Sequence, residues 1–300
     1  MTEAEAIEIL RHNKGLIIYF FLLLVSGLGC LISVLFKLKL ACHKAGEKRK
    51  VPAWKIGWLD FGLFIWCLIC SMILAQIIAP YLLNAISHTE ESYRVWNVIS
   101  GGVALHVGMI LVFVLFRYLQ PHLFPQSLSV EVIPFLKAAK LGTYYFLAAF
   151  PLVWITGLCS VFFFEILNQA GWGIPLDQQP LVGIFEDTQS PVALAILYIM
   201  AILIAPVAEE LVFRAGIYRF FKSRFPTVIS MLLSAILFSL LHTNFVSFFS
   251  LVVIGFSLCV AYELSGNIMV PIIFHSAFNL NSIILILFRS DLSCLGFLLN

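Results

Sequence analysis

Charge is scarce in this 300-residue chain. Asp, Glu, Lys and Arg make up 11% of the residues, against about 25% in an ordinary soluble protein, so a water-soluble globular protein is excluded. The formal net charge is only +2, which argues against a nucleic-acid partner because proteins that bind nucleic acids concentrate positive charge. Alternation of apolar and polar residues is also missing, and its absence excludes an outer-membrane β-barrel.

The seven cysteines give no sign of a disulfide framework or a structural metal site. Their number is odd and most of them lie inside apolar runs, which favours reduced, buried thiols. Cys67 and Cys70 form a CxxC pair, but no second pair accompanies it, so a zinc ribbon would lack half of its ligands.

Apolar residues, in contrast, dominate the chain. They account for 61% of it, and the mean hydropathy is +1.02. Apolar runs close to the length of a membrane span recur from one end to the other. The sequence therefore predicts an all-α fold, a polytopic transmembrane helical bundle of about eight spans that is integral to a membrane. The expected spans cover residues 15–36, 61–86, 96–118, 142–167, 192–213, 228–242, 248–263 and 268–288.

Four regions follow from this pattern. We expect an N-terminal transmembrane region with a basic loop and an interfacial segment (1–140), a fourth span with its outer loop (141–189), a C-terminal transmembrane core (190–288) and a short tail (289–300). Lysines and arginines crowd the loop after the first span, so the positive-inside rule places that loop in the cytoplasm. Alternation of the spans puts the basic turn near Arg219 and Arg224 on the same side.

The few ionisable residues of the last third are informative, because charge at membrane depth is costly and usually functional. Glu209 and Glu210 are adjacent and would point about 100° apart on a helix, so they cannot do the same job. Arg214 is one turn after Glu210, and the two can form an ion pair. This pair leaves Glu209 to face the interior of the bundle. The alternative is that both acids merely mark the end of the fifth span.

Two further clusters supply imidazole and amide groups. His242 and Glu209 are nearly equidistant from a turn near residues 223–226, so an antiparallel helix pair brings them to similar depth. His275 and Asn279 are four residues apart and project from one face of an apolar span. A capping role for His242, and polar bridging between helices for the other two, are the structural alternatives.

Together these groups can deprotonate a water molecule and stabilise a tetrahedral oxyanion, which are the requirements of peptide-bond hydrolysis. A Gly-x-Ser-x-Gly elbow and an HExxH helix are both missing from the sequence. Direct attack by water is therefore favoured over an acyl-enzyme, and the common zinc helix is excluded.

The three motifs, Glu-Glu-x-x-x-Arg, Phe-x-x-x-His and His-x-x-x-Asn, resemble those of the CPBP family, also called Abi or CAAX-protease-like intramembrane proteases. Order and helical context are similar, and the resemblance covers about residues 190–288. The matching residues are Glu209, Glu210, Arg214, Phe238, His242, His275 and Asn279.

The resemblance implies a polytopic endopeptidase with a polar cavity inside the lipid bilayer, acting on a peptide or membrane-protein substrate. Eukaryotic relatives remove the last three residues from prenylated CAAX proteins, and bacterial relatives are tied to bacteriocin maturation or immunity. It also implies that Glu209 and His242 activate the water, that His275 and Asn279 bind the oxyanion, and that the arginine-held glutamate supports them.

The role of metal stays open at this point. Glu209, His242 and His275 match the ligand set of a catalytic Zn²⁺, with water in the fourth position and Glu210 as base. A metal-free mechanism, in which Glu209 and His242 polarise the water, fits the same residues equally well.

Two other classes of function compete with a protease. One is a membrane transporter with midplane acids, although the sequence shows no inverted repeat. The other is a non-catalytic scaffold or bacteriocin-immunity protein of the same fold. The remaining polar residues inside spans, His106 and Gln76, are interpreted as interhelical hydrogen bonds, and Glu165 as interfacial.

Overall fold

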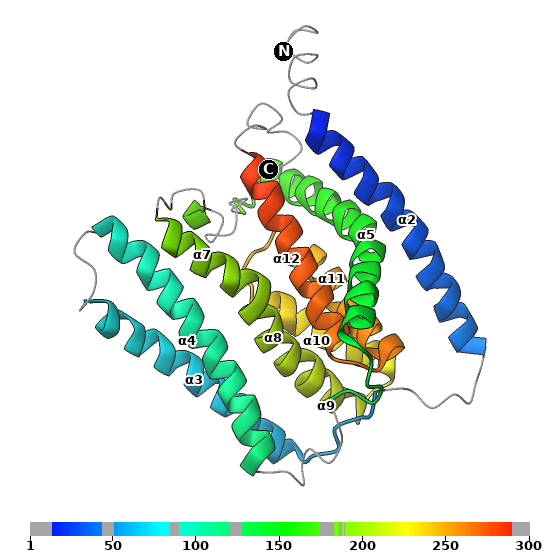
Figure 1. Ribbon diagram of the computed structural model, residues 1–300, viewed down its shortest axis with the longest axis horizontal. Helices are drawn as coiled ribbons and strands as arrows, with labels where there is room; N and C mark the ends of the chain where they lie inside the picture. The colour runs from blue at the N-terminus through cyan, green and yellow to red at the C-terminus, as the bar shows by residue number, and fades with distance from the viewer. Residues whose placement is uncertain are drawn as a thin grey trace, which may run out of the picture.

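A computed structural model shows a bundle of long helices (Figure 1). It describes residues 14–43, 51–84, 90–119, 128–174, 183–185, 188 and 190–289. Most of the basic loop and, except for Arg289, the tail expected over 289–300 lie outside the described residues.

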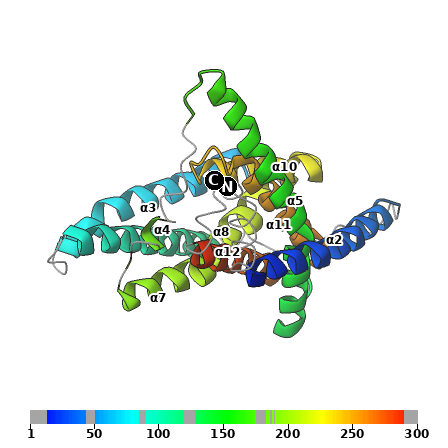
Figure 2. The same cartoon turned by 90° about the horizontal axis from the view of Figure 1, so that it is seen from above.

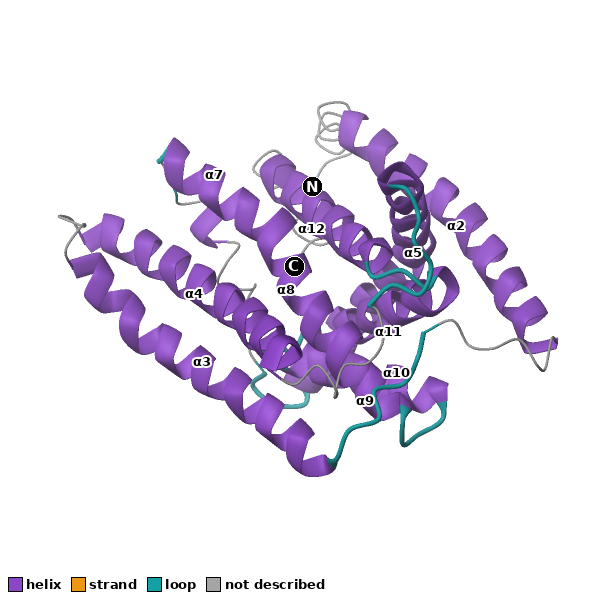
Figure 3. Cartoon of the chain, turned by 60° about the horizontal axis from the view of Figure 1, so that its bottom comes forward, coloured by secondary structure: helices purple, strands orange, loops and turns teal. Residues whose placement is uncertain are grey.

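Within these residues every regular element is helical, as Figure 3 shows by colour. The all-α prediction is therefore confirmed. The elements are α2 (Lys14–His43), α3 (Trp58–Asn84), α4 (Glu90–Leu119), α5 (Phe135–Gln169), α7 (Pro191–Ile199), η1 (Met200–Ile204), α8 (Ala205–Glu210), η2 (Leu211–Tyr218), α9 (Arg219–Lys222), α10 (Thr227–Leu240), α11 (Phe248–Ser265) and α12 (Met269–Arg289).

Seven helical stretches among the described residues are long and apolar enough to cross a membrane. The protein is thus a multi-pass integral membrane protein. The surface agrees with lipid contact, since Phe21 and Trp66 are exposed by 61% and 63%. Large exposed apolar side chains of this kind would be unfavourable in water but suit hydrocarbon.

The expected span over 228–242 differs from the other seven. It forms α10, which has 14 residues, and at 1.5 Å per residue it is about 21 Å long, whereas a bilayer core is about 30 Å thick. The helix begins directly after Pro226 and gives way to a turn at Leu241. The expected bounds of 228 and 242 therefore lie within two residues of those of the helix.

One helical column carries the first motif. It runs from Pro191 to Lys222 and joins α7, η1, α8, η2 and α9. It starts where the Ser190 hydroxyl accepts a hydrogen bond from the Ala193 amide (3.4 Å) and Pro191 takes the first helical position, both of which favour a helix start. The column contacts α4 along most of its length and α12 around α8.

This column occupies the middle of the molecule. Figures 1 and 2 place α3 and α4 on one side of α8, with α2 and α5 on the other side beyond α12. Helices α10 and α11 pack closely beside the site, where a Cβ atom on Gly255 would come within 2.9 Å of the Ala235 Cα atom. The absence of a side chain at this position lets the two backbones approach closely.

Three connections that the charge pattern assigned to the cytoplasm meet at one end of the bundle. Arg219 donates to the Pro52 carbonyl (2.9 Å), and Lys222 donates to the Val51 carbonyl (2.7 Å). The Tyr262 hydroxyl donates to the Leu128 carbonyl (2.6 Å), which joins the segment before α5 to α11. The loops that the positive-inside rule assigns to the cytoplasmic side are thus hydrogen bonded at the same end of the structure.

Candidate active site

The two adjacent glutamates lie on α8, a short α-helical piece between the wider π-helical turns η1 and η2. Such π-helical insertions occur frequently at functional sites. Glu210 is completely buried, whereas the Glu209 side chain keeps 15% of its surface exposed, toward a cavity. The two adjacent glutamates therefore point in different directions, as predicted.

Glu210 and Arg214 form the predicted ion pair. Arg214 Nη1 donates to Glu210 Oε1 over 2.8 Å, and both side chains are fully buried. A second guanidinium nitrogen donates to the Gly255 carbonyl (3.2 Å), which the close approach of α10 and α11 brings within reach. The guanidinium carbon lies 4.6 Å from the ring centre of Phe238, a favourable cation–π position.

His275 on α12 is oriented by this ion pair. Its Nδ1 lies 2.9 Å from Glu210 Oε1. A carboxylate paired with a guanidinium can only accept a hydrogen bond, so Nδ1 of His275 carries the proton and donates. The opposite ring nitrogen, Nε2, then faces Glu209 Oε2 at 3.8 Å.

Glu209 is held at one oxygen and free at the other. Its Oε1 lies 3.3 Å from Nε2 of His106 on α4. Its Oε2 is buried and has no hydrogen-bond partner among the described residues. A buried carboxylate oxygen without a protein partner is poorly satisfied and is available to a water molecule or a substrate.

His242 and Asn279 complete the predicted set. His242 follows α10, and its Nδ1 donates to the Phe238 carbonyl (2.8 Å), which leaves the lone pair of Nε2 free in the neutral ring. Asn279 donates one amide hydrogen to the Ala201 carbonyl (2.7 Å) in η1 and retains a second one.

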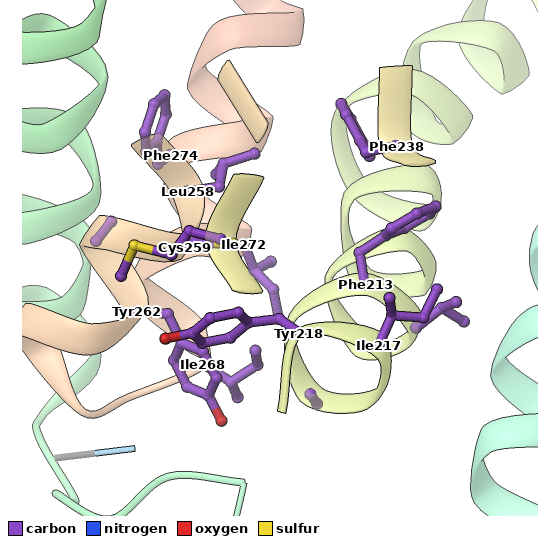
Figure 4. Packing of buried hydrophobic residues seen from close by; sticks show 14 of the residues in the cluster. Phe213, Ile217, Tyr218, Phe238, Leu258, Cys259, Tyr262, Ile268, Ile272 and Phe274 are labelled. Atoms are coloured by element: carbon purple, nitrogen blue, oxygen red, sulfur yellow. The ribbon is translucent and has the colours of Figure 1, made fainter. Parts of the chain in front are cut away.

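All of these groups except the buried ion pair line one cavity of about 830 Å³. Its walls come mainly from apolar side chains of α3, α4, α10 and α12. Its polar lining residues include His106, Glu209, His242, His275 and Asn279. Each of the three motifs therefore contributes side chains to this cavity. Figure 4 shows the hydrophobic packing next to it, where Phe213 and Phe238 lie close to each other.

Comparison with known proteins covers this same part of the chain. Residues 191–281 match the family model described as type II CAAX prenyl endopeptidase Rce1-like. This segment is similar to that family. The match confirms, at the level of the family, the resemblance drawn from the three motifs.

One curated relative of the chain is the UPF0177 protein YbdI of Lactococcus lactis subsp. lactis (strain IL1403). It is 34% identical over 84 residues, which cover 28% of this chain and 45% of the relative. The match therefore spans less than half of that relative's length. No solved structure matches the chain.

The predicted zinc ligands of the Rce1-like segment do not form a ligand set as they stand. Among the residues that the structure describes, no three His, Cys, Asp or Glu side chains are arranged to hold a metal ion. One oxygen of Glu209 is already engaged by His106, whereas the bond from Nδ1 of His242 to a carbonyl leaves its Nε2 free. Zinc binding stays a prediction from the sequence, and no step proposed below runs through a metal.

His106 is the residue at the site that the sequence did not assign to it. An interhelical hydrogen bond was expected and is present, but its partner is the glutamate of the first motif. The available signal was a histidine well inside an apolar span. Its partner, 103 residues away, could not be inferred from spacing.

Proposed function

We propose that this protein is an intramembrane endopeptidase that hydrolyses a peptide bond by direct attack of water. The observation that carries the proposal is the unpartnered Oε2 of Glu209, which shares a cavity with the imidazoles of His242 and His275. A carboxylate and an imidazole can together take a proton from water, and further donors can stabilise the oxyanion that forms. The Rce1-like match supports this assignment at the family level.

In the proposed reaction Glu209 Oε2 accepts a proton from a water molecule as the water oxygen adds to the peptide carbonyl. The free Nε2 of His242 polarises the same water. His275 Nε2 and the second amide hydrogen of Asn279 donate to the oxyanion. Both nitrogens of His275 must then be protonated, and the oxyanion itself offsets the positive charge of this ring. The proton on Glu209 then passes to the leaving amine when the carbon–nitrogen bond breaks, so the carboxylate is regenerated.

The cavity suggests a substrate with a large apolar part. Most of its lining is aliphatic or aromatic, and the polar groups are few and gathered around Glu209. Pockets of this kind bind apolar ligands and use a few polar groups to orient them. A lipid-modified C-terminal peptide, as in the description of the family model, is therefore the first substrate to test.

The test uses the purified protein in proteoliposomes with an internally quenched peptide that ends in a farnesylated cysteine, two aliphatic residues and methionine. We expect cleavage by the wild-type protein and at least a ~100-fold loss in Glu209→Gln, the scale of a missing general base. Glu165→Gln is the matched control, because this glutamate on α5 is exposed and does not line the cavity. Wild-type turnover in Glu209→Gln would refute the mechanism.

Membranes of cells that express either variant extend the test to the natural substrate. Comparative proteomics should find an uncleaved protein that accumulates with Glu209→Gln and not with Glu165→Gln. An ion or solute flux in proteoliposomes without any cleavage would instead support a transporter. Full complementation by Glu209→Gln would support a scaffold.

A further inference from the structure

We propose that His106 is a positioning residue for Glu209, supplied by a part of the chain that lies outside the Rce1-like match. It holds one carboxylate oxygen of Glu209 so that the other faces the cavity. The inference rests on the proposed function, since it assigns a role within that reaction. His106 comes from α4, which precedes the matched residues 191–281 by about 70 positions along the chain.

The hydrogen bonds of His106 fix which nitrogen carries a proton. Nδ1 lies 2.7 Å from the Gly102 carbonyl of the preceding turn, and a carbonyl can only accept. Nδ1 is therefore a donor. In a neutral ring Nε2 would then be an acceptor, like the Glu209 oxygen that it faces at 3.3 Å. Two acceptors do not bond, so the contact requires one shared proton, either on the ring or on the carboxyl group.

The proposed reaction places the shared proton on the ring, because Glu209 has to be ionised to accept a proton from water. Arg214 and Glu210 already cancel each other in their ion pair. The other titratable groups that face Glu209 are His275 from α12 and His242 after α10, and neither lies within hydrogen-bond distance of Oε1. An imidazolium at position 106 leaves Glu209 ionised. The contact is then a charge-assisted hydrogen bond, which is stronger than a bond between neutral groups.

The geometric consequence concerns the second oxygen of Glu209. A carboxylate anchored at Oε1 cannot swing freely, so Oε2 stays near His275 Nε2, 3.8 Å away. Active groups perform best when their orientation is set by hydrogen bonds and packing rather than by chance. Helices α3 and α4 carry none of the three motifs. Through His106, this pair nevertheless takes part in the active site.

Two amide substitutions separate the two hydrogen bonds of His106. In His106→Gln the amide nitrogen occupies the place of Nε2 and can still donate to Glu209. In His106→Asn the amide nitrogen lies at the place of Nδ1. This variant therefore keeps the hydrogen bond to the Gly102 carbonyl and loses the one to Glu209. Both variants place an amide side chain at the same position of α4, so each serves as the control of the other.

With the farnesylated quenched peptide we expect kcat of His106→Asn to fall about 10–100-fold, the effect of one lost charge-assisted hydrogen bond. KM should change little, because His106 orients the base rather than the substrate. His106→Gln should recover most of the lost rate. Equal kcat values for the two amide variants, or a wild-type kcat in His106→Asn, would overturn the proposal.

A substrate-free measurement keeps this test separate from that of the proposed function. Melting temperatures of His106→Asn, Glu209→Ala and the double variant form a thermodynamic cycle. Both single variants break the same hydrogen bond, so their decreases in melting temperature should not add. We expect the double variant to melt at least ~2 °C above the temperature given by the sum of the two decreases. If wild-type protein does not cleave the peptide but the cycle is non-additive, the proposed function fails on this substrate and the link to His106 stands. Additive shifts refute the link.

Discussion

Arg214 offers the most demanding test of how the site is held together. Its side chain is fully buried and contacts Glu210, the Gly255 carbonyl and the ring of Phe238. Arg214→Met keeps most of the volume but leaves the Glu210 carboxylate without its cation. Removing one partner of a buried ion pair destabilises a protein by about 3–5 kcal/mol. At about 2–4 °C per kcal/mol, the melting temperature should fall by roughly 6–20 °C.

The assay is thermal unfolding of detergent-purified protein, followed by tryptophan fluorescence. The decisive comparison is with Glu210→Gln/Arg214→Met, which removes both charges while an amide oxygen still accepts from His275 Nδ1. We expect the double variant to melt above the single variant, because no uncompensated buried charge remains. Lys137→Met, which removes an exposed cation on α5, should melt like the wild type. The reasoning is refuted if the double variant melts below Arg214→Met, or if Arg214→Met melts like the wild type.

Three further predictions concern packing, metal and the cytoplasmic end. Gly255→Ala should destabilise the protein by about 1–3 kcal/mol through overpacking against Ala235, whereas Gly62→Ala, with nothing within 4 Å of the added Cβ, should be neutral or slightly stabilising in the same melting assay. Because the proposed reaction runs no step through a metal, incubation with 1,10-phenanthroline should leave the rate of peptide cleavage unchanged; a loss that added zinc restores would contradict this mechanism and support the predicted zinc ligands. Tyr262→Phe removes the hydrogen bond to the Leu128 carbonyl and should lower stability by about 1 kcal/mol in urea or thermal unfolding, without changing KM.

Local rules made the central part of the site predictable. Four-residue spacing on a helix was enough to expect the Glu210–Arg214 ion pair, which the structure contains. Symmetric placement about a turn was enough to expect Glu209 and His242 around one pocket. Hydropathy was enough for the helical membrane fold, because the bilayer requires long apolar segments whose backbone is internally hydrogen bonded.

Features that depend on packing between distant segments were not predictable in this way. His106 has an ordinary apolar context, and only the docking of α4 on α8 reveals Glu209 as its partner. The π-helical turns around α8 leave no distinct mark in composition, since residues 200–204 are as apolar as an α-helical span.

The shortness of α10 has a mechanical consequence for the surrounding lipid. A helix of about 21 Å beside full-length neighbours creates hydrophobic mismatch, which a bilayer relieves by thinning locally. Acyl chains next to α10 should therefore be compressed, and headgroups with their hydration water should dip toward the turn that carries His242. Short-chain phospholipids would match this depression at little elastic energy, whereas long-chain phospholipids would resist it. Bilayer thickness thus becomes a physical control on how easily solvent reaches the reaction centre.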